Sequence, residues 1–142
     1  MSIVSAGKTR FDFSDQTAVV TGGSRGIGRQ ICEAFAEAGA RVFTCSRREP
    51  ETPFSSDRIS CESVDVRDPE ATAAWLARCA EPGGGIDVLV NNAGGTPGVE
   101  AATAPAALTE KIIALNLTAP LVLAQQAYQA MQGCDGIGNI VN

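Results

Sequence analysis

Apolar and polar positions alternate along the chain in two distinct patterns. Short apolar runs, rich in β-branched residues, predict strands at about 16–21, 41–45, 59–64 and 86–91, with a fifth strand beginning at 139–141. Apolar residues that recur every three or four positions predict helices over about 26–38, 69–80 and 108–132. Because strands alternate with helices, we expect an α/β fold with a parallel sheet and helices on both faces.

Two of the predicted helices carry further signals. Asp68 followed by Pro69 is typical of a helix N-cap with proline at the first helical position. The apolar positions of the last helix cover nearly its whole circumference, so we expect burial on more than one side. One side would meet the sheet and another would meet a second subunit. Asn116 and Pro120 lie inside this helix, and the missing N–H of Pro120 predicts a kink with a free carbonyl at Asn116.

The segment Thr21–Gly28 reads T-G-x-x-x-G-x-G and lies between the first predicted strand and the first predicted helix. In this position, free N–H groups at the start of the helix can bind the phosphates of a dinucleotide. Gly22 allows a tight turn, Gly26 allows the backbone to approach a pyrophosphate, and Gly28 allows close packing of helix and strand. A glycine-rich turn of no function is the alternative interpretation.

A second motif, Asn91-Asn92-Ala93-Gly94, follows the apolar run at 86–90 directly. The two motifs, in this order and each at the end of a strand, resemble the short-chain dehydrogenase/reductase family. The resemblance implies a Rossmann-type doubly wound sheet with strand order 3-2-1-4-5, truncated after the start of strand five. It also implies an NAD(P)-dependent oxidoreductase that transfers hydride between nicotinamide and a small carbonyl or alcohol substrate.

The end of the second predicted strand is where such proteins distinguish NAD from NADP. An acidic residue there binds ribose hydroxyls, but this chain has Ser46-Arg47-Arg48. Arginine side chains offer forked donors to a 2′-phosphate, and Arg25 adds a further positive charge. We therefore expect NADP(H) to be preferred. NAD(H) stays possible because Glu49 is close, and the alternative is that both arginines are solvated loop charges.

The resemblance assigns roles to several other residues. Asp65 and Val66 match the family's adenine contact, although Asp65 could instead cap the following turn. Asn91 is expected to be structural, and Asn116 matches the asparagine whose bound water relays protons, although Asn116 and Pro120 could instead form a packing kink. The expected cofactor-binding residues are Gly22, Ser24, Arg25, Gly26, Ile27, Gly28, Ser46, Arg47, Asp65, Val66, Asn92, Ala93 and Gly94, and Asn116 is the expected catalytic residue.

The family's catalytic serine and Tyr-x-x-x-Lys are not found. The single tyrosine, Tyr128, is followed four residues later by Gln132 and lies where a core residue is expected. The chain ends at Asn142, where the strand leading to the catalytic serine would begin. We therefore expect residues 1–142 to be one incomplete domain, the cofactor-binding part, inactive alone. The alternative is a stand-alone dinucleotide-binding or interaction module.

Composition limits the partners. The 142 residues carry a net charge of −5, which argues against nucleic acid or an anionic membrane as a main partner. We expect no segment long and apolar enough to span a membrane without polar interruption. The absence of histidine excludes a histidine base or ligand from this chain. Its five scattered cysteines are typical of reduced thiols in a cytoplasmic protein, so no metal site is expected.

Overall fold

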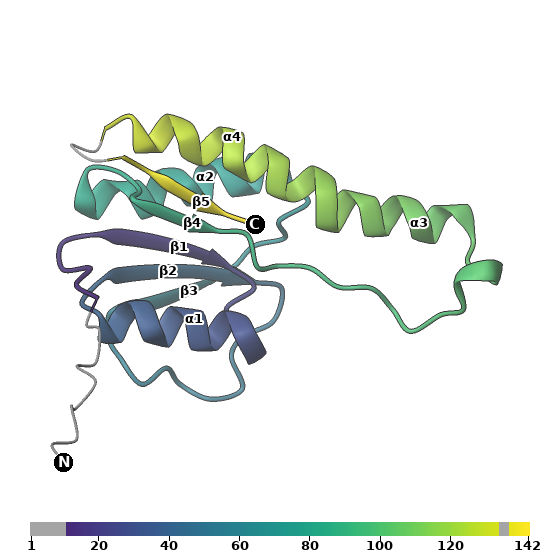
Figure 1. Cartoon of the computed structure of the whole chain (residues 1–142), viewed down its shortest axis with the longest axis horizontal. Helices are drawn as coiled ribbons and strands as arrows, with labels where there is room; N and C mark the ends of the chain where they lie inside the picture. The colour runs from purple at the N-terminus through teal and green to yellow at the C-terminus, as the bar shows by residue number, and fades with distance from the viewer. Residues whose placement is uncertain (1–10, 134–136) are drawn as a thin grey trace, which may run out of the picture.

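The computed structural model describes residues 11–133 and 137–142 (Figure 1). Five parallel strands form one sheet in the order β3-β2-β1-β4-β5, which confirms the predicted fold class and strand order. The strands are β1 (Thr17–Thr21), β2 (Arg41–Ser46), β3 (Ile59–Ser63), β4 (Val88–Val90) and β5 (Asn139–Val141). All five residues of β1 and all three of β4 are buried. These central strands are buried on both sides because helices cover both faces of the sheet, and their residues are apolar except for Thr17 and Thr21 at the two ends of β1.

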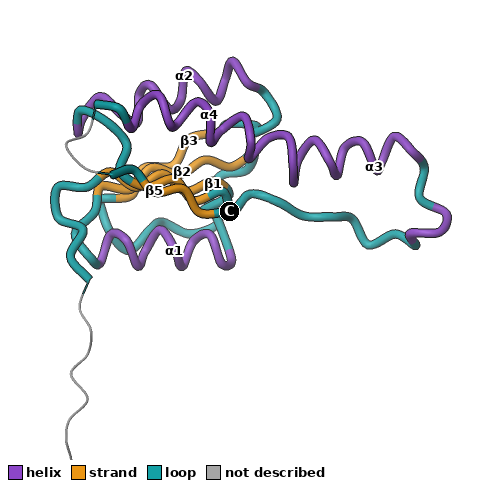
Figure 2. Tube along the Cα trace, turned by 45° about the horizontal axis from the view of Figure 1, so that its top comes forward, coloured by secondary structure: helices purple, strands orange, loops and turns teal. Residues whose placement is uncertain are grey.

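Helices form a layer on each side of the sheet (Figure 2). One face is covered by α1 (Gly26–Glu37), and the other by α2 (Pro69–Ala80) and α4 (Ala119–Met131). Short 3₁₀ turns, η1 (Glu81–Gly83) and η2 (Ala101–Thr103), lie in the connections. The Asp68 carboxylate accepts from the N–H groups of Glu70 at 3.0 Å and Ala71 at 3.1 Å, and this confirms the predicted N-cap of α2.

The strands are paired so that their carboxyl ends reach one edge of the sheet. Thr21 at the end of β1 is aligned with Cys45, and the last residue of β2 is aligned with Ser63. On the other side of β1, Val20 is aligned with Val90. The loops that carry both sequence motifs therefore leave the sheet next to one another.

The last helical stretch is continuous from Ala106 to Met131 but has three parts. An α-helix, α3 (Ala106–Ile113), is followed by a π-helical turn, η3 (Ala114–Thr118), and then by α4. At the position of the predicted kink the helix has this wider turn, in which the Ala119 N–H donates to the Ala114 carbonyl. Figures 1 and 2 show residues 95–113, including α3, extending away from the sheet; we call this segment the projecting arm.

Burial of this helix differs from the prediction. α3 buries no residue, and α4 buries a single stripe formed by Ala119, Leu123, Ala127 and Met131. Within the described residues the helix is therefore buried on one side only. Tyr128, expected in the core, is 55% exposed, because it follows Ala127 and so lies about 100° around the helix from the stripe.

The helices α1 and α2 each bury one side against the body of the protein. In α1 the stripe on the sheet consists of Gly28, Cys32 and Ala36, whose small side chains let the helix lie close, so Ile27 faces solvent. In α2 the buried residues are Thr72, Trp75, Leu76 and Cys79, and Ala74 is exposed. At the start of the described chain, Phe13 packs edge-on against Phe35, whereas Phe11 is 68% exposed.

The helix Ala106–Met131 also meets the length and composition of a membrane-spanning helix. It has 26 residues, and its most apolar 18-residue window has a mean hydropathy of 1.4. Of that window, 11% is buried. The expectation that no segment reaches this length and apolarity is therefore wrong. The packing of α4 against α2 and the sheet accounts for its buried stripe without a membrane.

Candidate dinucleotide-binding site

A cleft of about 470 Å³ lies at the carboxyl edge of the sheet. All thirteen expected cofactor-binding residues line it, and they come from the glycine turn, the ends of β2 and β3, and the Asn92-Ala93-Gly94 segment. The further lining residues are Cys45, Arg48, Glu49, Glu51, Val64 and Leu115. The fold therefore brings together segments that are about 70 residues apart in the sequence. Asn116 does not line the cleft; its neighbour Leu115 does.

The glycine turn leaves backbone exposed on the cleft side. Gly26 has φ +57°, and a Cβ built there would meet no atom within 4 Å, so this part of the turn is open to a ligand. At Gly28 the opposite holds, because a Cβ would lie closer than 3.0 Å to the Gly22 carbonyl oxygen and to Asn92 Nδ2. Gly28 is therefore required for internal packing, as the sequence predicted, whereas the space beside Gly26 is open.

The N-terminus of α1 lies at the cleft, and no acidic side chain in its first turn neutralises the positive end of the helix dipole. Arg25 at the N-cap is extended, its side chain makes no capping bond, and the first turn of α1 has no Asp or Glu. The first N–H groups of a helix have no partner inside the helix, and its dipole is positive at this end. These features suit an anion such as a pyrophosphate.

The second motif holds the glycine turn in place. Asn92 Nδ2 donates to the carbonyls of Thr21 at 2.9 Å and Gly22 at 3.3 Å, and the Ala93 N–H donates to Thr21 Oγ1 at 2.9 Å. Asn92 therefore has a structural role in addition to lining the cleft. Asn91 Nδ2 donates to the carbonyl of Pro120 and to Asn142 Oδ1, which agrees with its expected structural role.

Thr44 supports the turn and was not singled out from the sequence. Its hydroxyl accepts from the Gly23 N–H at 2.9 Å and donates to the Val20 carbonyl at 2.6 Å, so it joins β1 to the glycine turn. Thr44 is fully buried. A fully buried threonine needs a partner for its hydroxyl, so a polar residue inside the apolar run at 41–45 was the available signal.

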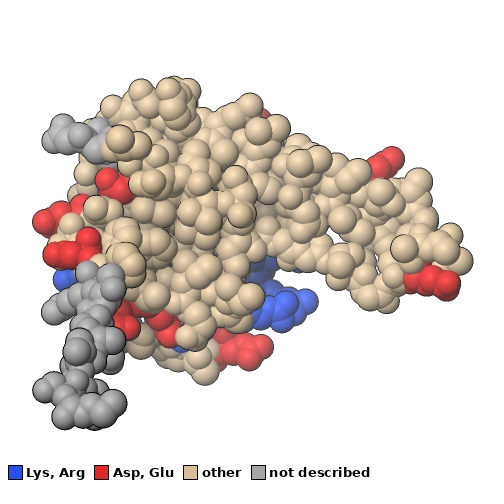
Figure 3. All heavy atoms as spheres, viewed as in Figure 1, with Lys and Arg blue, Asp and Glu red and all other residues tan. Residues whose placement is uncertain are grey.

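Charged side chains of both signs surround the mouth of the cleft. Arg25, Arg47 and Arg48 line it together with Glu49 and Glu51. Figure 3 shows Lys and Arg atoms gathered on the side of the body that faces the projecting arm, with acidic atoms more widely spread. Ser46 Oγ donates to the Arg48 carbonyl and so fixes the start of the loop that carries the arginines.

Asp65 is engaged by a neighbouring arginine. Its Oδ1 accepts from the Arg67 N–H at 3.0 Å and from Nε at 2.9 Å, and its Oδ2 accepts from Nη2 at 2.5 Å. These hydrogen bonds lower the pKa of Asp65 to about 2. The turn contact, one of the two interpretations drawn from the sequence, is present. Asp65 also lines the cleft next to Val66, and a carboxylate retains acceptor capacity for an adenine amino group.

The side chain of Asn116 joins the π-helical turn to the projecting arm. Its Oδ1 accepts from the Gly95 N–H and its Nδ2 donates to the Gly95 carbonyl, both at 2.9 Å, and Nδ2 also donates to the Ile112 carbonyl. Asn116 thus pairs with Gly95 as a strand residue would. Its position beside the end of the cleft is compatible with the expected role, although its side chain is already bonded.

A family model described as short chain dehydrogenase matches residues 16–142, almost the whole chain. The chain belongs to the short-chain dehydrogenase family. It spans about half the length of the relatives that it matches. A "Rhamnolipids biosynthesis 3-oxoacyl-[acyl-carrier-protein] reductase" of Pseudomonas aeruginosa is 38% identical over 82% of this chain and 48% of its own length.

Solved structures of the short-chain dehydrogenase type share the fold. One from Sinorhizobium meliloti 1021 has a TM-score of 0.80 and 36% identity, over 94% of this chain and 56% of its own length. The ligand-free aldohexose dehydrogenase of Thermoplasma acidophilum has a TM-score of 0.80 and 28% identity, over 89% of this chain and 48% of its own.

Three cysteines of this short-chain dehydrogenase, Cys32, Cys45 and Cys79, are buried. Burial raises the pKa of Cys32 to about 11 and those of Cys45 and Cys79 to about 12, so these thiols stay protonated at neutral pH. Cys134 lies outside the described residues. Among residues 11–133 and 137–142, no group of three or more Cys, Asp or Glu side chains could hold a metal.

Proposed function

We propose that residues 1–142 form the NADP(H)-binding part of an oxidoreductase that transfers hydride between nicotinamide and a small carbonyl or alcohol substrate. The main support for this proposal is that three arginines, Arg25, Arg47 and Arg48, lie at the mouth of the cleft. The glycine turn, which is open to a ligand, lines the same cleft. A bound nicotinamide dinucleotide supplies the hydride acceptor or donor, and the protein positions it. NAD(H) remains a weaker cofactor in this proposal because Glu49 and Glu51 share the same rim.

Each group of cleft residues has a binding role in the proposal. The open N–H groups of the turn at Ser24–Gly28, with the positive end of α1, bind the pyrophosphate. Asp65 and Val66 contact the adenine, by a hydrogen bond to its amino group and by packing on the ring. Asn92, Ala93 and Gly94 border the ribose near the nicotinamide. Small side chains at 93 and 94 leave room there.

Proton transfer is assigned in part to residues outside 1–142. Asn116 would hold a water through its backbone carbonyl, in the wide turn at Ala114–Thr118, and so take part in a proton relay. No Tyr-x-x-x-Lys occurs in this sequence, so residues 1–142 alone should not reduce a carbonyl. NADPH oxidation by this chain with a panel of ketones, above that of heat-inactivated protein, would contradict the proposal.

The arginine assignment has a direct test. Arg47→Ala should weaken NADPH binding by roughly 1–3 kcal/mol, the range for a hydrogen bond to a charged group, and leave NADH nearly unchanged. The measurement is titration of each cofactor by fluorescence or calorimetry. Equal losses for both cofactors would mean that Arg47 does not contact a 2′-phosphate.

The exposed side of the long helix supports a second proposed property, self-association. Leu117, Leu121 and Tyr128 are 65%, 58% and 55% exposed, and they come from η3 and α4. Burying such residues between two copies of the helix would make a homo-oligomer, in a cytoplasmic protein without nucleic-acid or membrane partners. This face also suits the alternative of a stand-alone binding module. Light scattering with Leu121→Glu tests it, since a charge there should lower the oligomer's mass.

A further inference from the structure

The loop of residues 47–58 carries the arginine pair but has little structure of its own. It connects β2 to β3 without a helix, and most of its residues are exposed. At its far end the Arg58 guanidinium donates to the Gly39 carbonyl at 3.3 Å. Something must hold the middle of the loop if Arg47 and Arg48 are to keep a fixed position at the cleft.

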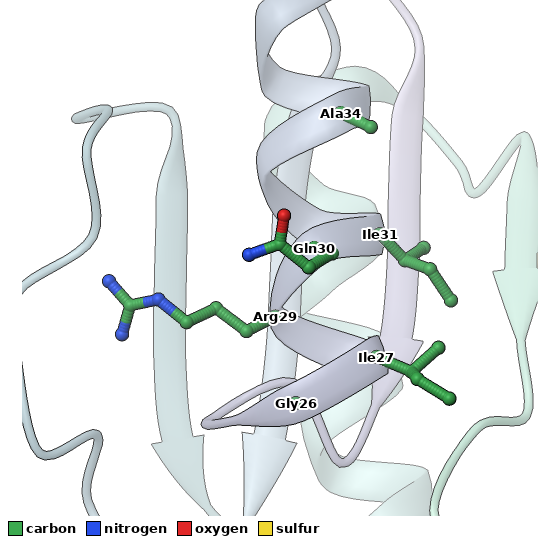
Figure 4. Close-up of a pocket in the computed structure, with 6 residues that line it drawn as sticks. All are labelled: Gly26, Ile27, Arg29, Gln30, Ile31 and Ala34. Atoms are coloured by element: carbon green, nitrogen blue, oxygen red, sulfur yellow. The ribbon is translucent and has the colours of Figure 1, made fainter.

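Arg29 of α1 contacts the middle of this loop through both terminal nitrogens and one face of its guanidinium. Nη1 donates to the Thr52 carbonyl at 2.8 Å, and Nη2 donates to the Pro53 carbonyl at 2.5 Å. The guanidinium carbon lies 4.6 Å from the centre of the Phe54 ring, which is a cation–π contact. Figure 4 shows Arg29 extending from α1 away from the side that carries Ile27 and Ile31.

The side chain of Arg29 is itself fixed. Its Nε donates to Glu33 Oε1 at 3.0 Å, one turn along α1, and the Arg29 side chain is only 16% exposed. A planar fork is needed to reach two adjacent carbonyls while stacking on a ring. A lysine would keep the charge but could not make this set of contacts.

We propose that Arg29 is a positioning residue that sets the preference for a 2′-phosphorylated cofactor, and this inference rests on the proposed function. The Arg29 N–H donates to the Arg25 carbonyl at 3.3 Å, so Arg29 lies one turn beyond the glycine turn on the same helix. Through its side chain the helix also holds the loop that follows Arg47 and Arg48. The arginines on the two sides of the cleft therefore have a fixed spacing, and a preorganised site binds its ligand more tightly.

A competing explanation leaves Arg29 without this role. Phe54 packs against the core between α1 and the sheet, and Arg58 holds the far end of the loop. If these two contacts fix the loop alone, replacing Arg29 changes nothing at the cleft. Arg29→Lys separates the explanations. It keeps the positive charge near the cleft but removes the paired hydrogen bonds to the Thr52 and Pro53 carbonyls and the stacking on Phe54.

The experiment uses the full-length protein, with Arg29→Lys, Arg29→Gln and the control Arg78→Gln. Arg78 also pairs with a glutamate, at 2.6 Å, but on α2 and outside the cleft. We expect the dissociation constant for NADPH to rise roughly tenfold in both Arg29 variants and that for NADH by less than about twofold. Without cofactor, trypsin should cleave Arg29→Lys faster than wild type after Arg47 and Arg58, as mass spectrometry would show.

The outcomes are distinct. If wild type prefers NADPH and Arg29→Lys keeps that preference and its resistance to trypsin, the role of Arg29 is wrong while the proposed function stands. A loss that is equal for NADPH and NADH would also overturn it, because Arg29 would then support the whole glycine turn. If wild type binds both cofactors equally well, the proposed NADP(H) preference fails first, and the role of Arg29 fails with it.

Discussion

The glycine turn lines the cleft and the projecting arm lies outside its lining, and the two regions are held in opposite ways. Thr44, Asn92 and Ala93 form hydrogen bonds with the turn, and the strands behind it are buried. The arm has no buried residue in α3 or η2, and its side-chain link to the body is Asn116 on Gly95. Local stability follows buried contacts, so the glycine turn should be rigid and the arm should open readily.

The largest difference between the two regions should appear in side-chain truncation. Leu123→Ala in α4 removes a side chain that is 1% exposed and should lower the free energy of unfolding by about 2–5 kcal/mol. Ile113→Ala in α3, where the side chain is 47% exposed, should change it by less than about 0.5–1 kcal/mol. Urea unfolding measures both. Similar losses would mean that the arm packs as firmly as the body.

A glycine pair gives the next largest effect. Gly28→Ala places a Cβ against the Gly22 carbonyl oxygen and Asn92, so the turn must shift at a cost of roughly 1–3 kcal/mol. Gly98→Ala, in the arm, meets no atom within 4 Å and should be neutral or slightly stabilising. Thermal unfolding of the two variants measures the contrast. An unchanged melting temperature for Gly28→Ala would contradict the close packing of helix and second motif.

Removing Asn116 should loosen the arm alone. Asn116→Ala loses the two hydrogen bonds to Gly95. We expect amide hydrogen exchange at Gly95 to rise by roughly tenfold, which corresponds to the net contribution of about one hydrogen bond. The Gly23 amide, bonded to Thr44, is the internal control and should not change. Faster exchange at both amides would show that the two regions open together.

The smallest expected effect is the loss of stability at low pH when Asp65 becomes protonated. Because Arg67 lowers the pKa of Asp65 to about 2, the carboxylate contributes stability above its ordinary pKa of 3.8 and loses it as pH falls toward 2. Asp65 is about one-third exposed, so we expect less than about 1 kcal/mol. Unfolding of Asp65→Asn should be less pH-dependent than that of wild type between pH 4 and 2. Identical pH profiles would mean that the pair contributes nothing measurable.

Local patterns in the sequence predicted the strands, and the resemblance to the short-chain dehydrogenase/reductase family predicted their order and the residues that line the cleft. Apolar runs mark strands buried on both faces, and glycines mark a turn that only they can adopt. The last helix was harder, because residues that are apolar all around do not show which side faces the sheet, and Tyr128 was placed wrongly for that reason. The contacts of Arg29 depend on the path of an irregular loop, which no periodic pattern reveals.

The π-helical turn at Ala114–Thr118 has a geometric consequence for the arm. A π turn holds one residue more than an α turn, and each residue of an α-helix advances by about 100°. The side chains of α3 are therefore rotated by about one residue, or about 100°, relative to those of an uninterrupted α-helix. The one extra residue in the π-helical turn sets the direction in which they point. Deleting one residue here would rotate the side chains of α3 by more than a quarter-turn without altering any of them.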